Sequence, residues 1–425
     1  MITETETLAA VCARFAERPY VTVDTEFMRE RTYYAQLCLV QLAVPGEGSA
    51  AVAKGARDAA PDAGSEAAPD AGSDAKSDAG PEDGANGAGE AVLVDPLADG
   101  IDLAPLYALL SDPRVVKVFH AARQDVEIFY HRGGVIPAPM FDSQVAAMVL
   151  GYGEQVGYET LVRKIARVEL DKSSRFTDWS RRPLSEHQLR YALGDVTHLR
   201  TIYETLAERL ASTGREEWVR EEIASLTDPA TYDVDPGEMW RRVKARTGNG
   251  ETLAVVRELA RWREETAQTR DVPRARLMKD DALVEIAAAK PRDVEGLSKM
   301  RLLQREGRRP ELAEAILAAV ARGVACPPTD RPQLPPPPRR KEGSAAVADL
   351  LRVFLKARAD SLGIAPKLLA SSSDLDALAG DEAPDVPALH GWRLQVFGAD
   401  ALRLKTGEVG LKAGRRGVEM IETPG

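Results

Sequence analysis

The sequence predicts an α/β domain with a mixed β-sheet, followed by a helical C-terminal half. From residue 121 to 206 the pattern turns from strands to helices, and strands that alternate with helices indicate an α/β domain, which we expect to end near residue 212. From 213 onward the chain is predicted to be helical throughout. The strand segments are short runs of β-branched and apolar residues, at 21–28, 37–44, 91–97 and 115–120.

The first predicted strand is charged on one face only. In a strand, residues two apart project to the same side, so Asp24 and Glu26 lie side by side while Val21 and Val23 face the other way. Two carboxylates held this close repel each other and raise each other's pKa. A hard divalent cation between them relieves that repulsion. On this motif alone, a solvated edge strand with two surface acids is the alternative.

The remaining elements follow from periodicity. The nearly all-apolar strand at 37–44 suits a sheet interior. Gly133 and Gly134 end the first helix after the strands. The last helix presents Leu189, Leu193 and Val196 as one apolar stripe. The predicted helices lie at 5–18, 121–132, 142–150, 157–166 and 184–206.

A segment rich in Gly, Ala, Asp and Ser interrupts the sheet at 46–90. It holds ten acids and three bases, so 3 − 10 = −7 of the chain's net charge of −10 falls here and −3 elsewhere. With one large apolar residue it cannot offset its chain entropy, so we expect it to be disordered and to lengthen a hairpin loop. Asp-Ala-Gly recurs every eight residues, but the apolar positions of a calcium-binding solenoid are missing.

The helical half is predicted to contain two domains. We expect the first at 213–322, a Pro-rich linker at 323–343 and the second at 344–425. Four consecutive prolines at 335–338 make that linker stiff and extended. Residues 233–322 carry 19 Lys and Arg against 16 Asp and Glu, a slight basic excess.

Composition excludes several classes of protein. The 425 residues, 44% of them hydrophobic, suffice for several domains with cores. No run of about 18 apolar residues occurs, so no membrane span is expected, and the acidic N-terminus lacks a signal-peptide core. The separated cysteines, Cys12, Cys38 and Cys326, argue against a disulfide framework and against zinc, and they suit a cytoplasmic location.

Two downstream acids extend the charged motif. Asp125 lies one turn into the helix after a buried strand, at the sheet edge where α/β folds bind ligands. Asp195 lies on the long helix, and Tyr191, four residues earlier, shares its face. Singly, each is typical of a solvated or rim residue; together with Asp24 and Glu26 they form a constellation of four acids and a tyrosine.

This constellation resembles a known family. Tyr191, four residues before Asp195, matches the tyrosine subclass of the DEDD 3′–5′ exonucleases, whereas the histidine subclass would have His where Arg190 stands. Flanking segments, including 31–34 and 141–144, are similar to the ribonuclease D family. Residues 259–289 resemble its helical HRDC domain, and 344–425 resemble a weaker second copy. The three matching motifs are Asp24-Thr25-Glu26-Phe27, His120-Ala121-Ala122-Arg123-Gln124-Asp125 and Tyr191-Ala192-Leu193-Gly194-Asp195.

The resemblance implies a ribonuclease H-like fold and two divalent metal ions, Mg²⁺ or Mn²⁺. One ion, held by Asp24, Glu26 and Asp195, would generate the attacking hydroxide. The other, near Asp24 and Asp125, would stabilise the leaving 3′ oxygen. Tyr191 would orient the attacking water, because a phenol with an unperturbed pKa near 10 is a poor base.

The resemblance also implies a substrate. We expect a 3′–5′ exoribonuclease that releases nucleoside 5′-monophosphates from RNA, with tRNA precursors as the substrate, and the sequence names no protein partner. Stacking on the terminal base is expected of Phe27 and Met28, with core packing as the alternative. Phosphate contacts are expected of the polar loop that contains Arg182, with a solvated loop as the alternative. The candidate substrate-binding residues are Phe27, Met28, His120, Lys172 and Arg181.

Two other functions remain open at this point. A DNA 3′–5′ exonuclease uses the same metal chemistry, so rates on matched RNA and DNA oligonucleotides would separate the two. A non-catalytic RNA-binding protein built on a dead nuclease is disfavoured, because such proteins lose metal ligands, whereas all four acids and Tyr191 are present.

Overall fold

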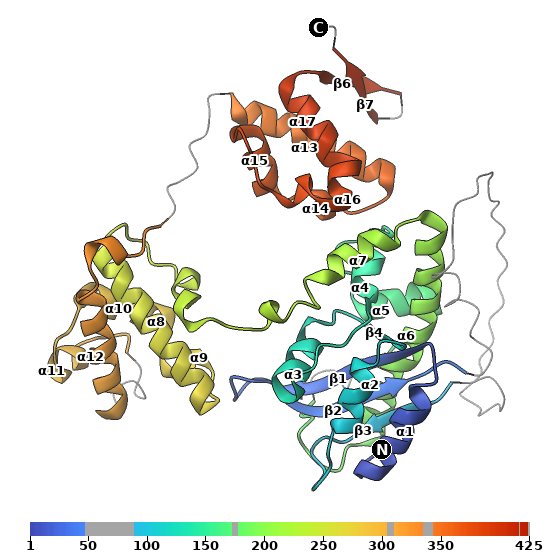
Figure 1. Cartoon of the computed structure of the whole chain (residues 1–425), viewed down its shortest axis with the longest axis horizontal. Helices are drawn as coiled ribbons and strands as arrows, with labels where there is room; N and C mark the ends of the chain where they lie inside the picture. The colour runs from blue at the N-terminus through green and yellow to red at the C-terminus, as the bar shows by residue number, and fades with distance from the viewer. Residues whose placement is uncertain (47–88, 172–176, 304–309, 335–342, 416, 424–425) are drawn as a thin grey trace.

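A computed structural model shows how the chain folds (Figure 1). The segment that we expected to be disordered, 46–90, lies almost wholly outside the residues that the structure describes, as does Lys172. The described residues are 1–46, 89–171, 177–303, 310–334, 343–415 and 417–423.

A five-stranded sheet in the order β3-β2-β1-β4-β5 forms the frame of the N-terminal domain. The β1–β2 and β2–β3 pairs are antiparallel, whereas β1–β4 and β4–β5 are parallel, so the predicted mixed sheet is confirmed. The expected hairpin pairing of β2 with β3 is confirmed as well. We had not predicted β5, because it spans three residues, too few to show a periodicity. The strands span Tyr20–Met28 (β1), Gln36–Ala43 (β2), Ala91–Val94 (β3), Val116–Phe119 (β4) and Met140–Asp142 (β5).

Helices cover both faces of this sheet, which makes three layers (Figure 1). Val21 and Val23 of β1 are fully buried in one layer, against the first set of helices. That set comprises α1 (Thr5–Phe15), α2 (Ala104–Ser111) and α3 (Arg123–Gly133). The opposite layer comprises α4 (Ser143–Val149), α5 (Tyr158–Leu161) with its π-helical continuation η1 (Val162–Ala166), α6 (Glu186–Thr213) and α7 (Glu216–Ala224).

Helix α6 lies over the face of β1 that carries the acids. A capping box between Ser185 and Gln188 starts it, and Gly214 in the left-handed conformation ends it, so the helix runs past the predicted end at 206. Its buried residues include Ala192 and Val196, whereas Leu189 and Leu193 are only half-buried. Of the predicted apolar stripe, only Val196 is therefore fully buried.

The first helical domain has its own core and touches the N-terminal domain through the β1–β2 loop. Asp271, in the left-handed conformation at the end of α8, accepts hydrogen bonds from the backbone N–H groups of Tyr33 at 2.9 Å and Tyr34 at 3.0 Å. The Tyr33 hydroxyl also donates to Glu264. The helices span Gly250–Arg270 (α8), Arg274–Leu277 (α9), Asp280–Ala289 (α10), Val294–Ser298 (α11) and Pro310–Val324 (α12).

The C-terminal unit packs on α7, and its core is continuous with that of the N-terminal domain (Figure 1). Trp392 stacks on Trp218 with ring centroids 4.3 Å apart, and Arg393 pairs with Glu222 at 2.6 Å. Its helices span Ser344–Leu362 (α13), Pro366–Leu369 (α14), Ser372–Gly380 (α15), Gly391–Arg393 (α16), the π-helical Leu394–Gly398 (η7) and Ala399–Thr406 (α17).

The prediction that this second unit is all-helical is wrong at its end. An antiparallel hairpin of β6 (Val409–Gly414) and β7 (Gly417–Glu422) closes the chain. Val409 and Leu411 alternate with polar or small residues, a period of two that suits a strand rather than a helix. Among the residues that the structure describes, none of the helices could span a membrane.

Candidate active site

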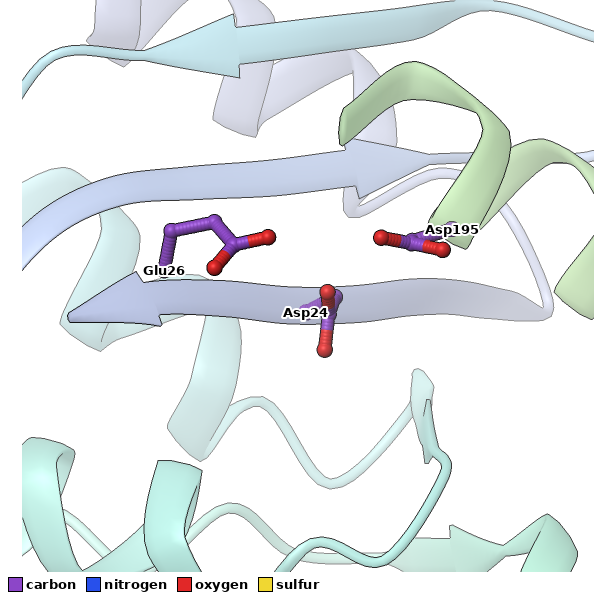
Figure 2. Close-up of side chains that lie close together, drawn as sticks. All are labelled: Asp24, Glu26 and Asp195. Carbon is purple, nitrogen blue, oxygen red and sulfur yellow. The ribbon is translucent and has the colours of Figure 1, made fainter. Parts of the chain in front are cut away.

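Three acids meet where β1 passes beneath α6. Asp24 and Glu26 project from the same face of β1, and Asp195 reaches them from α6 (Figure 2). One carboxylate oxygen of each lies within 4.8 Å of the others, close enough to hold a single metal ion. Thr22 fixes the helix against the strand, because its hydroxyl donates to the Val196 carbonyl at 2.8 Å.

The fourth acid lies beside this group on a different element. Asp125 is buried in the first turn of α3, and its carboxylate accepts a hydrogen bond from the Thr25 hydroxyl at 2.5 Å. Burial raises the pKa of Asp125 well above its ordinary value, and the charge of Asp24 raises it further. Thr25 stands between two acids of the predicted motif, but we assigned it no role from the sequence.

The electrostatics of the cluster favour a cation. Burial raises the pKa of Asp24 to about 7. Burial, and then the charges of Asp24, Asp195 and Asp125, raise the pKa of Glu26 to about 9. Carboxylates that would otherwise stay protonated near neutral pH ionise together only when positive charge is added. Because every donor is a carboxylate oxygen, the set suits hard divalent ions such as Mg²⁺ and Mn²⁺.

A cavity of about 380 Å³ opens beside these acids. Asp24, Asp195 and Tyr191 line it together, so the tyrosine faces the same space as the carboxylates. Tyr158 lines the cavity from α5, and its hydroxyl donates to the Gly194 carbonyl at 3.0 Å. No sequence signal marked Tyr158, because it contributes only through the packing of α5 on α6.

The sharp corner between β4 and α3 forms one wall of the cavity. Ala121 adopts a left-handed φ of 60°, which a residue with a Cβ rarely adopts. The buried Asp142 carboxylate holds this corner by accepting from the N–H groups of Ala121 at 3.1 Å and Ala122 at 2.9 Å. Asp142 lies in a flanking segment that marked the family resemblance, but we had given it no role.

His120 precedes this corner and lines the cavity. Its Nδ1 lies 2.9 Å from the Ser143 hydroxyl, and its ring lies 5.5 Å from that of Tyr158. Burial lowers the pKa of His120, although Asp142 opposes that effect, so the imidazole is held neutral.

The other predicted substrate contacts lie elsewhere. Phe27 and Met28 are half-buried and pack against the two cores on either side of β1, and neither lines the cavity. Arg181 is largely exposed and pairs with Asp178 at 3.3 Å.

The Arg182 side chain is engaged in hydrogen bonds within the exonuclease domain. It donates twice to the Asp95 carboxylate, each time at 2.7 Å, and once to the Cys38 carbonyl at 2.6 Å. The expectation that Arg182 binds phosphate is therefore wrong, since a residue distant in sequence already occupies its donors.

A second and larger cleft, of about 820 Å³, lies between the N-terminal and the first helical domains. Arg123, Arg242 and Lys279 line it, and all three are exposed without an ion pair to any described residue. Tyr33 and Tyr232 add aromatic surface to its walls. Because Arg123 begins α3 two residues after Ala121, the cleft lies next to the catalytic cavity.

Comparison with known proteins identifies the family. A 3′–5′ exonuclease family model matches residues 1–59 and 83–211, and an HRDC domain model matches 252–320. The chain is 52% identical over 421 residues to ribonuclease D of Jannaschia sp., covering 99% of both chains. It is 47% identical to ribonuclease D of Granulibacter bethesdensis, covering 100% of this chain and 96% of that one.

The chain belongs to the ribonuclease D family. It is accordingly a 3′–5′ exoribonuclease with an exonuclease domain of mixed sheet followed by an HRDC domain. The crystal structure of Escherichia coli RNase D supports the same fold, with a TM-score of 0.74 at 26% identity over 96% of this chain and 98% of that one. The family resemblance that the sequence motifs indicated is thus confirmed.

Proposed function

We propose that this ribonuclease D family member trims the 3′ ends of tRNA precursors and releases nucleoside 5′-monophosphates. The observation that supports this most is the cluster of Asp24, Glu26 and Asp195, with Asp125 beside it. Asp24 and Asp195 line a cavity that Tyr191 also lines. The Escherichia coli relative is described as an exoribonuclease involved in structured RNA processing, which supports a structured RNA as the substrate.

In this proposal the four acids hold two metal ions. Asp24, Glu26 and Asp195 would hold one Mg²⁺ or Mn²⁺ ion, and Asp24 and Asp125 would hold the second. When bound, two such ions clamp the attacking and the leaving oxygens of an in-line displacement. Thr25 keeps Asp125 oriented through its 2.5 Å hydrogen bond.

Two ring side chains complete the proposed site. The Tyr191 hydroxyl orients the attacking water, since its ordinary pKa near 10 makes it a poor base. The neutral His120 ring packs on the terminal nucleotide, because it lines the cavity while Ser143 holds its Nδ1. We propose no substrate contact for Phe27 and Met28, which pack against the two cores at the end of β1. Arg181 is proposed to contact phosphate from the rim of the cavity.

The chemistry is tested with a 5′-end-labelled tRNA precursor. Incubation with Mg²⁺ or Mn²⁺ should shorten it one nucleotide at a time from the 3′ end, with nucleoside 5′-monophosphates as products, and EDTA should stop the reaction. A DNA oligonucleotide of matched sequence serves as the comparison. Faster degradation of DNA than of RNA, or full activity in EDTA, would contradict the proposal.

The interdomain cleft supplies a path for the RNA upstream of its last nucleotides. Single strands bind along grooves that combine positive charge with aromatic surfaces, and this cleft offers both beside the catalytic cavity. We therefore propose that the first helical domain contacts the substrate. Three further arginines of the cleft are already paired with carboxylates. Arg29 pairs with Glu127 at 2.5 Å, Arg263 with Asp280 at 2.7 Å and Arg274 with Glu264 at 3.3 Å. The cations available for phosphates are Arg123, Arg242 and Lys279.

Charge reversal in the cleft tests this path. In the double variant Arg242→Glu/Lys279→Glu two phosphate contacts are lost, so the slope of log affinity against log salt for a single-stranded RNA should become shallower by about 1.4. If the two proteins bind equally at 1 M salt, this change in slope lowers the affinity of the variant at 0.1 M salt by roughly 25-fold. Turnover of a trinucleotide, which reaches only the catalytic cavity, should be unchanged.

A matched control separates local contacts from total charge. Arg276→Glu/Arg292→Glu makes the same charge change on exposed residues of the same domain that do not line the cleft. Equal salt slopes in the two double variants would rule out the cleft. Point variants are preferable to ending the chain near Ala230, because truncation would expose Trp218, on which the C-terminal unit packs.

Two broader assignments stay proposals. We propose the domain limits of the sequence prediction, an exonuclease domain at 1–212, a first helical domain at 213–322 and a divergent HRDC-like unit at 344–425. The core of the exonuclease domain extends past the first limit, because α7 packs into it. We also propose a cytoplasmic location, supported by the three cysteines, all of which are buried free thiols.

A further inference from the structure

Gln41 is a buried polar residue, without a hydrogen-bond partner among the described residues, in an interior strand of the sheet. It is fully buried in β2, and neither its side-chain nitrogen nor its side-chain oxygen has a hydrogen-bond partner among the described residues. A buried amide left unpaired destabilises a fold by about 1–3 kcal/mol. Such a group in a native structure therefore calls for an explanation other than stability.

The strand register places Gln41 directly opposite Asp24. The pair Asp24–Gln41 belongs to the antiparallel β1–β2 ladder. Residues directly opposite in such a ladder project from the same face, with Cβ atoms about 5 Å apart. Gln41 therefore lies on the face that also carries Glu26, beneath α6.

The neighbours of Gln41 on β2 and β3 are apolar. On β1 the polar Thr22 and Glu26 also lie on this face, two residues to either side of Asp24 and therefore diagonal to Gln41. Along β2 the same face carries Leu39 and Ala43, and across β3 Gln41 is paired with Leu93. Ala192 and Val196 of α6 are fully buried above it. Hydrocarbon side chains offer a carboxamide nothing to bond, so the carboxylate across the ladder is the acceptor nearest in register.

Asp24 in turn has few donors of its own. Its carboxylate accepts a hydrogen bond from the Thr25 backbone N–H. An ionised carboxylate in such a place is stabilised by a charge-assisted hydrogen bond. The unused donor of Gln41 and the underused acceptor of Asp24 thus lie on adjacent strands.

We propose that Gln41 is a positioning residue for Asp24, whose carboxylate accepts a hydrogen bond from the Gln41 side-chain nitrogen when a divalent ion binds. The amide then holds the carboxylate in one rotamer, with its remaining lone pairs directed to the ions. This inference rests on the proposed metal site. Partners that orient a metal ligand in this way typically change metal affinity by 10–100-fold when they are removed.

The test is Gln41→Met, which keeps the length of the side chain and removes both polar atoms. Mn²⁺ binding is measured by calorimetry without RNA, and the melting temperature is measured in EDTA. We expect Mn²⁺ affinity to fall by about 10–100-fold. The metal-free melting temperature should stay equal or rise, since an unpaired buried amide is gone. Gln36→Met is the matched control, the same change at an exposed position of the same strand.

The outcomes are distinct. Unchanged Mn²⁺ affinity in folded Gln41→Met would overturn the role of Gln41, whereas a wild type that binds no Mn²⁺ would overturn the metal site itself. A smaller apolar variant, Gln41→Leu, is made in parallel. If neither variant folds, the inference is also overturned, because a side chain with no partner in the metal-free protein should be dispensable for folding.

Discussion

Replacing Glu26 by glutamine removes a charge that the metal-free fold resists. Burial and three neighbouring acids raise the pKa of Glu26 from 4.5 to about 9. A carboxyl whose pKa is raised by folding holds its proton in the folded state while the unfolded chain loses it. The stability that the protonated Glu26 contributes is therefore fully present below pH 4.5 and is lost progressively as the pH rises toward 9. Glutamine, which has no proton to lose, escapes this dependence.

The size of the effect follows from the width of that window. At pH 6 the unfolded carboxyl lies 1.5 pH units above its pKa of 4.5, and at about 1.36 kcal/mol per unit the wild type is less stable than Glu26→Gln by about 2 kcal/mol. Each kcal/mol shifts the melting temperature of a domain of this size by roughly 2–4 °C. We therefore expect the variant to melt about 4–8 °C higher at pH 6 in EDTA, while its turnover falls by at least ~10²-fold.

The assay is thermal unfolding in EDTA from pH 4.5 to 8, with turnover of a short RNA measured in Mn²⁺. The difference in melting temperature between variant and wild type should be near zero at pH 4.5 and should widen with pH. The exposed Glu30→Gln provides a control with the same chemical change. A difference that does not vary with pH, or a variant that melts lower at pH 7, would refute the reasoning, and wild-type turnover would remove Glu26 from the metal site.

Three further predictions follow from other contacts. Tyr191→Phe should slow single-turnover cleavage by about 10²–10⁴-fold with unchanged Mn²⁺ affinity, and weaker Mn²⁺ binding would instead make Tyr191 a ligand. Lys117, fully buried, donates to three backbone carbonyls at 2.5–2.7 Å, so Lys117→Met should destabilise the exonuclease domain by about 3 kcal/mol in urea unfolding. Burial lowers the pKa of Lys117 to about 8, so the wild type should gain stability from pH 8 to 10.5 and the Met variant should not. Trp392→Ala should destabilise the C-terminal unit by about 3–5 kcal/mol and speed its proteolysis, with trinucleotide turnover unaffected; unchanged proteolysis would mean that the Trp218 stack does not hold the unit.

Parts of the metal cluster could be predicted from the sequence, because its residues occur as two pairs whose members are close together in the chain. The period of two places Asp24 and Glu26 on one face of β1, and the helical period places Tyr191 beside Asp195. Joining the two pairs needed the family resemblance, since nothing local states that α6 crosses β1. The C-terminal hairpin could also have been predicted from its alternating apolar and polar residues. The sequence analysis extended the preceding helical pattern over it instead.

Periodicity and side-chain chemistry by themselves determined the mixed sheet, the helical C-terminal half and two pairs of residues, Asp24 with Glu26 and Tyr191 with Asp195. Only the tertiary structure decided which polar groups are already paired. From the sequence Arg182 was a candidate phosphate ligand, but in the structure its side chain pairs with Asp95. Gln41 carried no signal in the sequence, and the structure shows it buried, without a hydrogen-bond partner among the described residues, opposite Asp24. The physical reason is that hydrogen bonds and burial depend on distances between residues far apart in sequence, whereas periodicity reports only the direction in which neighbouring side chains point.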